Sequence, residues 1–513
     1  MSARAAFGVR LRAWLAPLVA PLALLVAMQP AVAQSFSIER VAFPDSAYLS
    51  QSELQAVASR YTDRSITFSD LEALLAEVQG LYAEAGIVTA RAILPPQDIV
   101  DGTLRVELVE AVVESIEIDG LDRTDPDFLR RNIGLAEGEL PDFERLERDL
   151  RVFDIAHDIA PQLSFAAGGT PGTTRVIIGG EEPPARTWML SADNFGRKET
   201  GELRASAFVR WSSVTGRRDI LSLQAQLSRG ARFAAAGYSL PAGPGGGRIV
   251  AAASYSRSDI VDGEFAIINV VARSDTASLA YSRPFRVRAA SHWMLDAGVG
   301  YERNVSSTTG LAFSDIRILD AYVAINHTRR FALSSLRAGV GLRAGRAQAE
   351  QTTETEGSFW LVFANLDYAR RATQNIVLEA ELSAQIAPDQ NLPVARLFTV
   401  GGPTTIRGYP INVRGGDSGL LARLQVSRAE PFERGDFAFR PFGFVDAAVV
   451  VPFRRDGGFD SDQDLLASIG AGLRMQYRDN ASALLMAGVP LIETQGFTDT
   501  GRPTVYFGID YRF

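Results

Sequence analysis

The chain has 513 residues, a formal net charge of −8 and no cysteine, so it has neither a disulfide framework nor a thiolate metal site. Its three histidines, His157, His292 and His327, are far apart and lack the spacing of metal ligands. Acidic chains are poor nucleic-acid binders, because that binding depends on clustered lysine and arginine. We therefore expect no metal, no cofactor and no nucleic-acid partner.

The first 33 residues have the three parts of a secretory signal peptide. Three arginines precede an apolar run from Ala13 to Met28, and Ala31-Val32-Ala33 is a small-residue cleavage site. The run is short and interrupted by proline, which disfavours the alternative of an uncleaved anchor. Cleavage would start the mature chain near Gln34 and change its net charge from −8 to −11, since three arginines and no acid are lost. No later apolar run reaches the roughly 18 residues of a spanning helix, so a membrane location would require a β-barrel.

Residues 34–110 and 111–182 predict two small α/β domains with one order of elements, strand, two helices and two strands. In the first domain we expect strand 36–43, helices 52–61 and 68–82, and strands 87–94 and 103–109. In the second we expect strand 113–118, helices 125–133 and 143–156, and strands 162–166 and 174–178. Each domain has about seventy residues, which can just sustain a core. The patterns alone would also fit two generic α/β domains without an assignable role.

The stretch ILPPQDIVDGTLRVELVEAVVESIEIDG, from Ile93 to Gly120, is more specific. It resembles the end of a polypeptide-transport-associated (POTRA) domain of the haemolysin secretion/activation type, followed by the start of a second one. The resemblance implies that both domains lie in the periplasm and capture an extended client chain. In such capture the client adds as a strand to an open sheet edge, where backbone hydrogen bonds give affinity without demanding one sequence.

Beyond a linker at Glu182-Pro183-Pro184 the helical periodicity disappears, and strand periodicity continues over residues 183–513. Residues 203–211, 378–386 and 467–477 alternate apolar and polar side chains, as a barrel with a lipid face and a wet face requires. A soluble β-sandwich has the same period. Turn signals after every second strand decide for the barrel: Pro241, Pro284, Arg329-Arg330, Arg370-Arg371, Pro431 and Asp479-Asn480. We count about sixteen strands, an even number, and predict a 16-stranded antiparallel outer-membrane β-barrel.

The chain stops on an amphipathic strand. Its apolar side chains share one face: Val505, Phe507, Ile509, Tyr511 and the terminal Phe513. A last strand that ends in phenylalanine resembles the signal by which outer-membrane barrels are recognised for insertion. The resemblance implies contact with the barrel-assembly machinery and with outer-membrane lipids.

Residues 387–418 are the one long break in the alternation, and loops of this length are usually functional or disordered. The break carries Ile406-Arg407-Gly408-Tyr409, which closely resembles the conserved loop motif of two-partner secretion transporters and of the wider BamA-like superfamily. In that family the loop folds into the lumen and its arginine meets an aspartate on the barrel wall. The alternative is an ordinary extracellular loop with an incidental arginine.

A matching wall motif is present in Phe442–Asp446, on the thirteenth predicted strand. Alternation there turns Phe444 and Asp446 toward the lumen and Val445 toward lipid. A guanidinium binds a carboxylate through two hydrogen bonds and keeps its charge, so Arg407 and Asp446 are suited to holding the loop inside the barrel.

The mature chain as a whole resembles a two-partner secretion transporter of the haemolysin secretion/activation family. This implies a monomeric outer-membrane pore that captures an unfolded exoprotein through its POTRA domains and passes it to the cell surface. One departure concerns the plug helix with which such transporters often begin. The first strand starts at Phe36, a few residues after the cleavage site, so the folded-in loop is the remaining candidate for closing the pore.

Two other functions stay open. One is an outer-membrane assembly factor of the same superfamily, although such factors generally carry more POTRA domains of another type. The other is a barrel enzyme, which needs a nucleophile with a nearby base. The barrel has only two histidines and no G-x-S-x-G motif, so we assign no catalytic residue.

Overall fold

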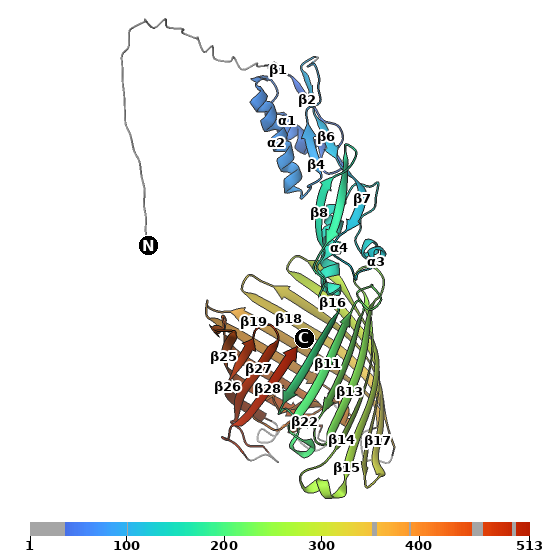
Figure 1. Cartoon of the computed structure of the whole chain (residues 1–513), viewed down its shortest axis with the longest axis vertical. Coiled ribbons are helices and arrows are strands. Elements are labelled where there is room, and N and C mark those ends of the chain that lie inside the picture. The colour runs from blue at the N-terminus through green and yellow to red at the C-terminus, as the bar shows by residue number, and fades with distance from the viewer. Residues whose placement is uncertain (1–35, 100, 351–355, 389–390, 454–464, 495–498) are drawn as a thin grey trace, which may run out of the picture. The chain divides into compact units, whose positions relative to one another are not determined.

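The computed structural model describes residues 36–99, 101–350, 356–388, 391–453, 465–494 and 499–513 (Figure 1). The predicted signal peptide lies outside the described residues. The chain divides into two units, Met1–Glu110 and Ala111–Phe513. No helix among the described residues is long and apolar enough to cross a membrane.

The first unit is an α/β domain. Its elements are β1 (Phe36–Ile38), β2 (Arg40–Ala42), α1 (Gln51–Ala58), β3 (Arg64–Ile66), α2 (Phe68–Glu84), β4 (Ala90–Ile93), β5 (Thr103–Arg105) and β6 (Glu107–Glu110). Both helices begin with a capping box, in which Ser50 or Thr67 exchanges hydrogen bonds with the acidic residue three positions later. The buried faces of the helices form the core with Leu54, Leu74, Val78 and Tyr82.

Two of the strands predicted in this unit are broken, because the chain changes its partner strand within each. The predicted strand 36–43 consists of β1, which pairs with β3, and β2, which pairs in parallel with β5. The predicted strand 103–109 is broken in the same way, since β6 pairs with β4. The prediction missed β3, whose three residues are too few to show a period.

The second unit begins with another α/β domain, whose order of elements confirms the prediction. It comprises β7 (Val112–Ile118), α3 (Pro126–Asn132), α4 (Phe143–Ala156), β8 (Gln162–Ala167) and β9 (Thr173–Gly179). The sheet order is β7-β9-β8, with β7 parallel to β9. The two helices pack Phe128, Leu129 and Phe153 against Val176 and Ile178 of the sheet.

The rest of the second unit is the barrel, in which sixteen long strands of the described residues close antiparallel with the short β24. The first eight are β10 (Arg186–Asp193), β11 (Arg204–Ser212), β12 (Ile220–Leu227), β13 (Ala231–Pro241), β14 (Arg248–Asp259), β15 (Val270–Arg288), β16 (Ser291–Thr308) and β17 (Leu311–Arg330). The others are β18 (Ser334–Glu350), β19 (Gly357–Arg371), β20 (Ile376–Ile386), β23 (Ser418–Arg428), β25 (Phe437–Val451), β26 (Leu465–Tyr477), β27 (Ala481–Pro490) and β28 (Thr504–Arg512), with β24 (Phe432–Arg434) before β25. The predicted 16-stranded barrel is confirmed.

Closure joins the first and last strands, which lie side by side in Figure 1. At the seam the backbone of Trp188 exchanges two hydrogen bonds with Phe513, at 3.0 and 3.1 Å, and the two rings stack. One predicted turn is wrong. Pro284 lies inside β15, where the register shifts between Pro284 and Arg286, and such a bulge accommodates a residue that has no N–H to donate.

The loop between β20 and β23 has some structure of its own. It contains the 3-10 helix η3 (Val394–Arg396) and a small hairpin of β21 (Phe398–Val400) and β22 (Arg414–Gly416). Two further 3-10 helices, η1 (Lys198–Thr200) and η2 (Glu264–Ile268), lie in other loops of the barrel. As predicted, the loop follows the eleventh barrel strand and the wall motif lies on the thirteenth.

Candidate functional site

Alternation on β25 places the wall motif as the sequence predicts. Phe444 and Asp446 are 4% and 0% exposed, whereas Val445 between them is 47% exposed on the outer face. The neighbouring strand β26 makes room for the inward rings with glycines. A Cβ on Gly470 would lie 2.2 Å from the Phe444 ring, so a larger residue could not stand there. The wall therefore presents one buried carboxylate beside an aromatic face.

Arg407 of the loop meets this carboxylate through three hydrogen bonds. Its Nη2 lies 2.6 Å from Asp446 Oδ1, and its Nε and backbone N lie 2.8 and 3.0 Å from Oδ2. The guanidinium carbon stands 3.5 Å from the centre of the Phe444 ring, and Nη1 donates to Gln425 Oε1 at 3.0 Å. These bonds confirm the predicted pairing of Arg407 with Asp446 as a bidentate ion pair, a two-bond fork, and both partners are almost fully buried.

The rest of the motif is seated by backbone contacts. Gly408 has φ +106°, and a Cβ there would lie 2.9 Å from the backbone of Gly488 on β27. Its N–H donates to Tyr506 Oη at 3.0 Å, and its carbonyl accepts from Thr504 Oγ1 at 2.8 Å. Tyr409 Oη donates to the carbonyl of residue 492 at 2.7 Å. Glycine is required because only its backbone can approach β27 so closely.

An apolar cluster joins the loop to the same wall. Ile406 and Val400 are 0% exposed and Tyr409 is 1% exposed. They pack against Leu421, Ala448, Val450 and Leu466 of β23, β25 and β26. This part of the loop is held as tightly as the core of a soluble domain, which rules out the alternative of an ordinary extracellular loop.

A second arginine anchors the other side of the loop, and sequence reasoning missed it. Arg396 at the end of η3 places Nε 2.7 Å from Asp320 Oδ2 on β17 and Nη1 2.6 Å from Glu302 Oε2 on β16. Asp320 is 4% exposed and also accepts from Arg343 of β18 at 3.2 Å. The only signal in the sequence was two acids at lumen-facing positions of long strands, which need partners once they are buried.

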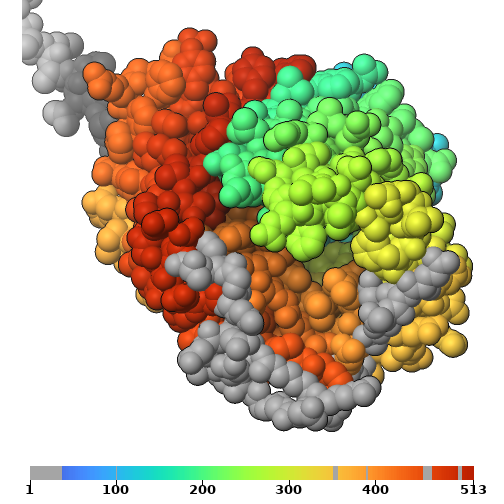
Figure 2. Space-filling model, turned by 90° about the horizontal axis from the view of Figure 1, so that it is seen from below, coloured from blue at the N-terminus to red at the C-terminus, as the bar shows by residue number. Residues whose placement is uncertain are grey.

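The two anchors hold the loop to walls that are not adjacent. Between β17 and β25 the barrel order places β18, β19, β20 and β23, so the loop crosses part of the lumen. Figure 2 looks into the barrel from the end away from the second α/β domain and shows orange atoms of this region between the red strands and the green and yellow ones. At its base, Asp417 accepts from the N–H groups of Leu392 and Phe453, each at 2.6 Å. The loop is a strap fixed at its base and at both anchors.

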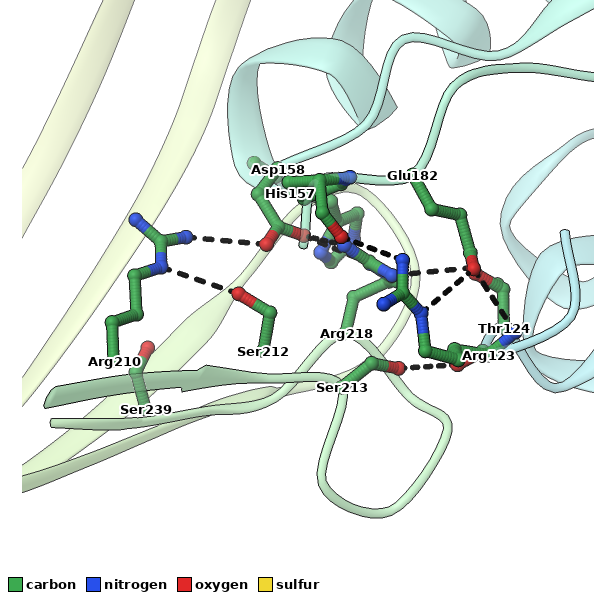
Figure 3. A network of polar contacts seen from close by, with 12 residues as sticks. Arg123, Thr124, His157, Asp158, Glu182, Arg210, Ser212, Ser213, Arg218 and Ser239 are labelled. Atoms are coloured by element: carbon green, nitrogen blue, oxygen red, sulfur yellow. Dashed lines mark hydrogen bonds and ion pairs between the residues drawn. The ribbon is translucent and has the colours of Figure 1, made fainter. Parts of the chain in front are cut away.

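A polar network joins the second α/β domain to the near end of the barrel (Figure 3). Arg218, in the turn between β11 and β12, is 0% exposed and donates through Nε to Asp158 at 2.8 Å and through Nη1 to Glu182 at 3.4 Å. Arg210 reaches the other oxygen of Asp158 at 3.2 Å. Sequence reasoning missed this network, because its members come from segments far apart in the chain.

Asp158 and His157 of this network have displaced pKa values. Burial acts to raise the pKa of Asp158, but the hydrogen bond and charge of Arg218 outweigh it, so the pKa lies below its ordinary value. Burial lowers the pKa of His157 to about 3, and the charge of Arg248 acts in the same direction. Arg248 Nη1 lies 3.1 Å from His157 Nδ1, and since arginine can only donate, the ring accepts there as the neutral form. The junction is therefore built for a neutral histidine and charged acids.

The predicted insertion signal has the expected geometry. Val505, Phe507, Ile509, Tyr511 and Phe513 are all exposed on the outer face of β28, by 39 to 57%. Their part in insertion stays a prediction. The other two histidines lie on β16 and β17, where the His327 ring stacks on Trp293 at 4.1 Å. Among the described residues no cluster of His, Asp and Glu could hold a metal ion.

A closed β-barrel with a strap anchored in its lumen, preceded by α/β domains, defines the class of POTRA-plus-barrel transporters of the outer membrane. The sequence pattern of the POTRA domain, ShlB-type, matches residues 36–111. The pattern of the haemolysin secretion/activation protein ShlB/FhaC/HecB matches residues 172–475, more than half of the chain. The chain therefore belongs to the haemolysin secretion/activation family, and it is an outer-membrane transporter of two-partner secretion with its POTRA domains in the periplasm. The predicted family, location and function are confirmed.

Similar proteins agree with this assignment. The outer membrane transporter CdiB of Dickeya dadantii is 24% identical over 413 residues, which cover 76% of this chain and 72% of that protein. The hemolysin transporter protein ShlB of Serratia marcescens is 25% identical over 472 residues, 87% of this chain and 81% of that one. The solved structure of CdiB from Escherichia coli has the same fold, with a TM-score of 0.71 at 19% identity over 96% of this chain and 94% of that chain.

Proposed function

We propose that residues 387–418 close the resting transporter, and that an exoprotein passes only when this strap gives way. The observation that carries the proposal is the buried fork between Arg407 and Asp446, with Arg396 as a second attachment on another wall. A segment fixed at both sides of a lumen obstructs it, whatever precedes the barrel in the chain. Ion pairs suit this task because their geometry is specific, whereas apolar packing alone would hold the loop less selectively.

The client enters, in this proposal, as an extended chain on the POTRA domains. In the second domain β8 is an edge strand, because among the described residues it pairs only with β9. Its backbone groups can accept an added strand, which gives affinity with little sequence preference. This is the binding mode that a transporter needs for a long unfolded client.

Further partners follow from the surface of the barrel. The exposed apolar outer face of the barrel contacts outer-membrane lipids, and the barrel-assembly machinery recognises the last strand, β28, during insertion. A closed barrel has no free edge, so one chain suffices and we propose a monomer. The protein translocates its client without covalent chemistry. Folding of the client outside the cell makes the transport proceed outward.

The test is secretion of an exoprotein client that is co-expressed with the transporter. Deleting the first POTRA unit, Phe36–Glu110, should abolish secretion, while the heat-modifiable band of a folded barrel should persist, since this unit has its own core. An isolated fragment of residues 34–180 should bind the client, and binding should resist single polar-to-alanine changes. Secretion at the wild-type rate in the deletion variant would contradict the proposed capture.

A further inference from the structure

The outer surface of the barrel carries a basic patch whose position across the membrane is fixed by the POTRA junction. The turn between β11 and β12, with Arg218, contacts the second POTRA domain, and so does Arg248 at the start of β14. This is the periplasmic end. The opposite ends of the strands, where β13 starts and β14 ends, therefore lie at the extracellular side of the membrane.

Three arginines stand next to one another at that extracellular end. Strand pairing sets Arg232 of β13 opposite Arg257 of β14, and Arg257 opposite Arg273 of β15. We call these three residues the arginine row. Like charges directly opposite one another on a sheet are unfavourable on their own, so such a row calls for an anion.

The row lies on the lipid-facing side of the barrel. Nearer the periplasm, residues at steps of two along the same strands are outward and apolar, among them Ala253 and Leu279, the latter 50% exposed, whereas Asp259 and Asp275 stand beside the arginines on this face. One step nearer the periplasm is Tyr255, 37% exposed, with the Arg273 guanidinium 5.2 Å from its ring centre. Exposed aromatic rings mark the boundary of the hydrocarbon core in outer-membrane barrels. The row just beyond Tyr255 thus lies at the level of the lipid headgroups of the outer leaflet.

The local ion pairs leave the arginine row able to bind a further anion. Arg257 pairs with Asp259 at 2.9 Å and Arg273 with Asp275 at 2.9 Å, and all four side chains are more than 30% exposed. Exposed pairs of this kind contribute little and can rearrange. Arg232 has no carboxylate within ion-pair distance among the described residues, and each guanidinium has five donors in all.

An apolar groove of about 560 Å³ lies next to the arginine row on its periplasmic side, on strands β11 to β14. It exists because its outward positions carry small side chains between larger ones. The lining includes Ala225, Ala234, Ala236 and Ala253, with Leu223 and Tyr255 at its sides. Ala234 is two residues from Arg232 and pairs with Tyr255, so groove and row are continuous.

We propose that row and groove together bind one phosphorylated, acylated glycolipid of the outer leaflet. The arginines would hold its phosphate groups through paired hydrogen bonds, for which guanidinium is better suited than an ammonium. The groove would hold an acyl chain of the same molecule. This site goes beyond the secretion function and does not depend on the strap.

The test uses the full chain in detergent and measures the temperature at which the heat-modifiable band is lost. Added lipopolysaccharide should raise this temperature, and the same lipid without phosphates, or vesicles of phosphatidylglycerol, should raise it much less. The variant R232Q/R257Q/R273Q should need about tenfold more lipopolysaccharide for the same shift. The matched control R288Q/R329Q/R330Q, which removes three exposed arginines at the periplasmic end, should respond like the wild type.

A second variant, Ala234→Phe with Ala236→Phe, fills the groove and leaves the arginines in place. It should also weaken the response to lipopolysaccharide, because the acyl chain loses its seat. If the triple arginine variant does not fold, Arg257→Gln alone is measured instead. An equal shift in the arginine variants and the wild type, or an equal shift with the dephosphorylated lipid, would overturn the proposal.

Discussion

Replacing Arg407 by alanine tests the strap most directly, because it leaves the Asp446 carboxylate buried without its guanidinium. The change removes contacts of 2.6 and 2.8 Å to Asp446, the bond to Gln425 and the stacking on Phe444. Removing one partner of a fully buried pair costs roughly 3–5 kcal/mol. We expect the lower end, because the backbone N–H of residue 407 still donates to Asp446 and Arg423 Nε lies 3.9 Å away.

A cost of about 3 kcal/mol shifts the balance between the docked and released strap by roughly a hundredfold. The barrel itself should insert normally, since the strap contributes no strand to its ladder. We therefore expect a normal heat-modifiable band and a loop that protease added to whole cells can cleave. Arg407→Lys should keep little of the loop's protection from protease, because an ammonium cannot form the two parallel hydrogen bonds of a guanidinium.

Arg474→Ala is the matched control. This lumen-side arginine of β26 stacks on Phe442, with its guanidinium carbon 4.9 Å from the ring centre, much as Arg407 stacks on Phe444. It should leave the loop protected. The decisive comparison is the double variant Arg407→Ala with Asp446→Ala. If the effects of the single changes on loop protection simply add, the two residues do not interact and the reasoning fails.

Four further changes test other parts of the structure. Arg396→Ala should raise the conductance of the reconstituted pore at a cost of about 1–3 kcal/mol to the docked strap, and a conductance unchanged from wild type would dismiss the second anchor. Gly408→Ala should release the loop to protease, whereas Gly415→Ala, where a Cβ meets its nearest neighbour at 3.3 Å, should not. The pKa of His157 in the folded protein is about 3, below its ordinary value, so the neutral ring stabilises the folded junction fully above pH 6.5. This stabilisation falls as the pH drops, and about 2 kcal/mol of it is lost at pH 5. Hydrogen exchange at residues 212–219 should therefore speed up at pH 5 in the wild type and less in His157→Gln. Deleting residues 511–513 should leave the protein in the periplasm, and normal barrel levels would reject the insertion signal.

The barrel could be predicted from the sequence because its information is local. Strand period 2 is visible wherever one face meets lipid and the other meets water, and the parity of β25 placed Asp446 in the lumen. The prediction failed where a local rule had a tertiary exception. Pro284 signals a turn in the sequence, yet a bulge carries it inside β15.

The second anchor and the POTRA junction could not be predicted, because their partners are distant in sequence. Arg396 lies 94 residues from Glu302, and Arg218 lies 60 residues from Asp158. Nothing in the local pattern around either arginine says which acid it meets. The packing of the loop inside the barrel brings Arg396 to Glu302, and the contact of the second POTRA domain with the barrel brings Arg218 to Asp158, whereas Arg407 was found through a motif that resembles those of a family.

Because the strap has two anchors, the rupture of a single ion pair opens it less readily than it would if there were only one anchor. When the pair at Asp446 breaks, the attachment at Asp320 and the base at Asp417 keep the motif close to its seat. A tethered group rebinds at a high effective concentration, so a brief rupture closes again before a long client can thread through. In this proposal, opening of the wild-type strap therefore requires that both ion pairs be lost together, or that a client chain occupy the space of the released loop, whereas a variant that lacks one pair opens when the other breaks. In the proposed mechanism, an extended client delivered at the periplasmic end would do this continuously, whereas a small solute would not. In this proposal, the arrangement favours passage of a polypeptide over leakage.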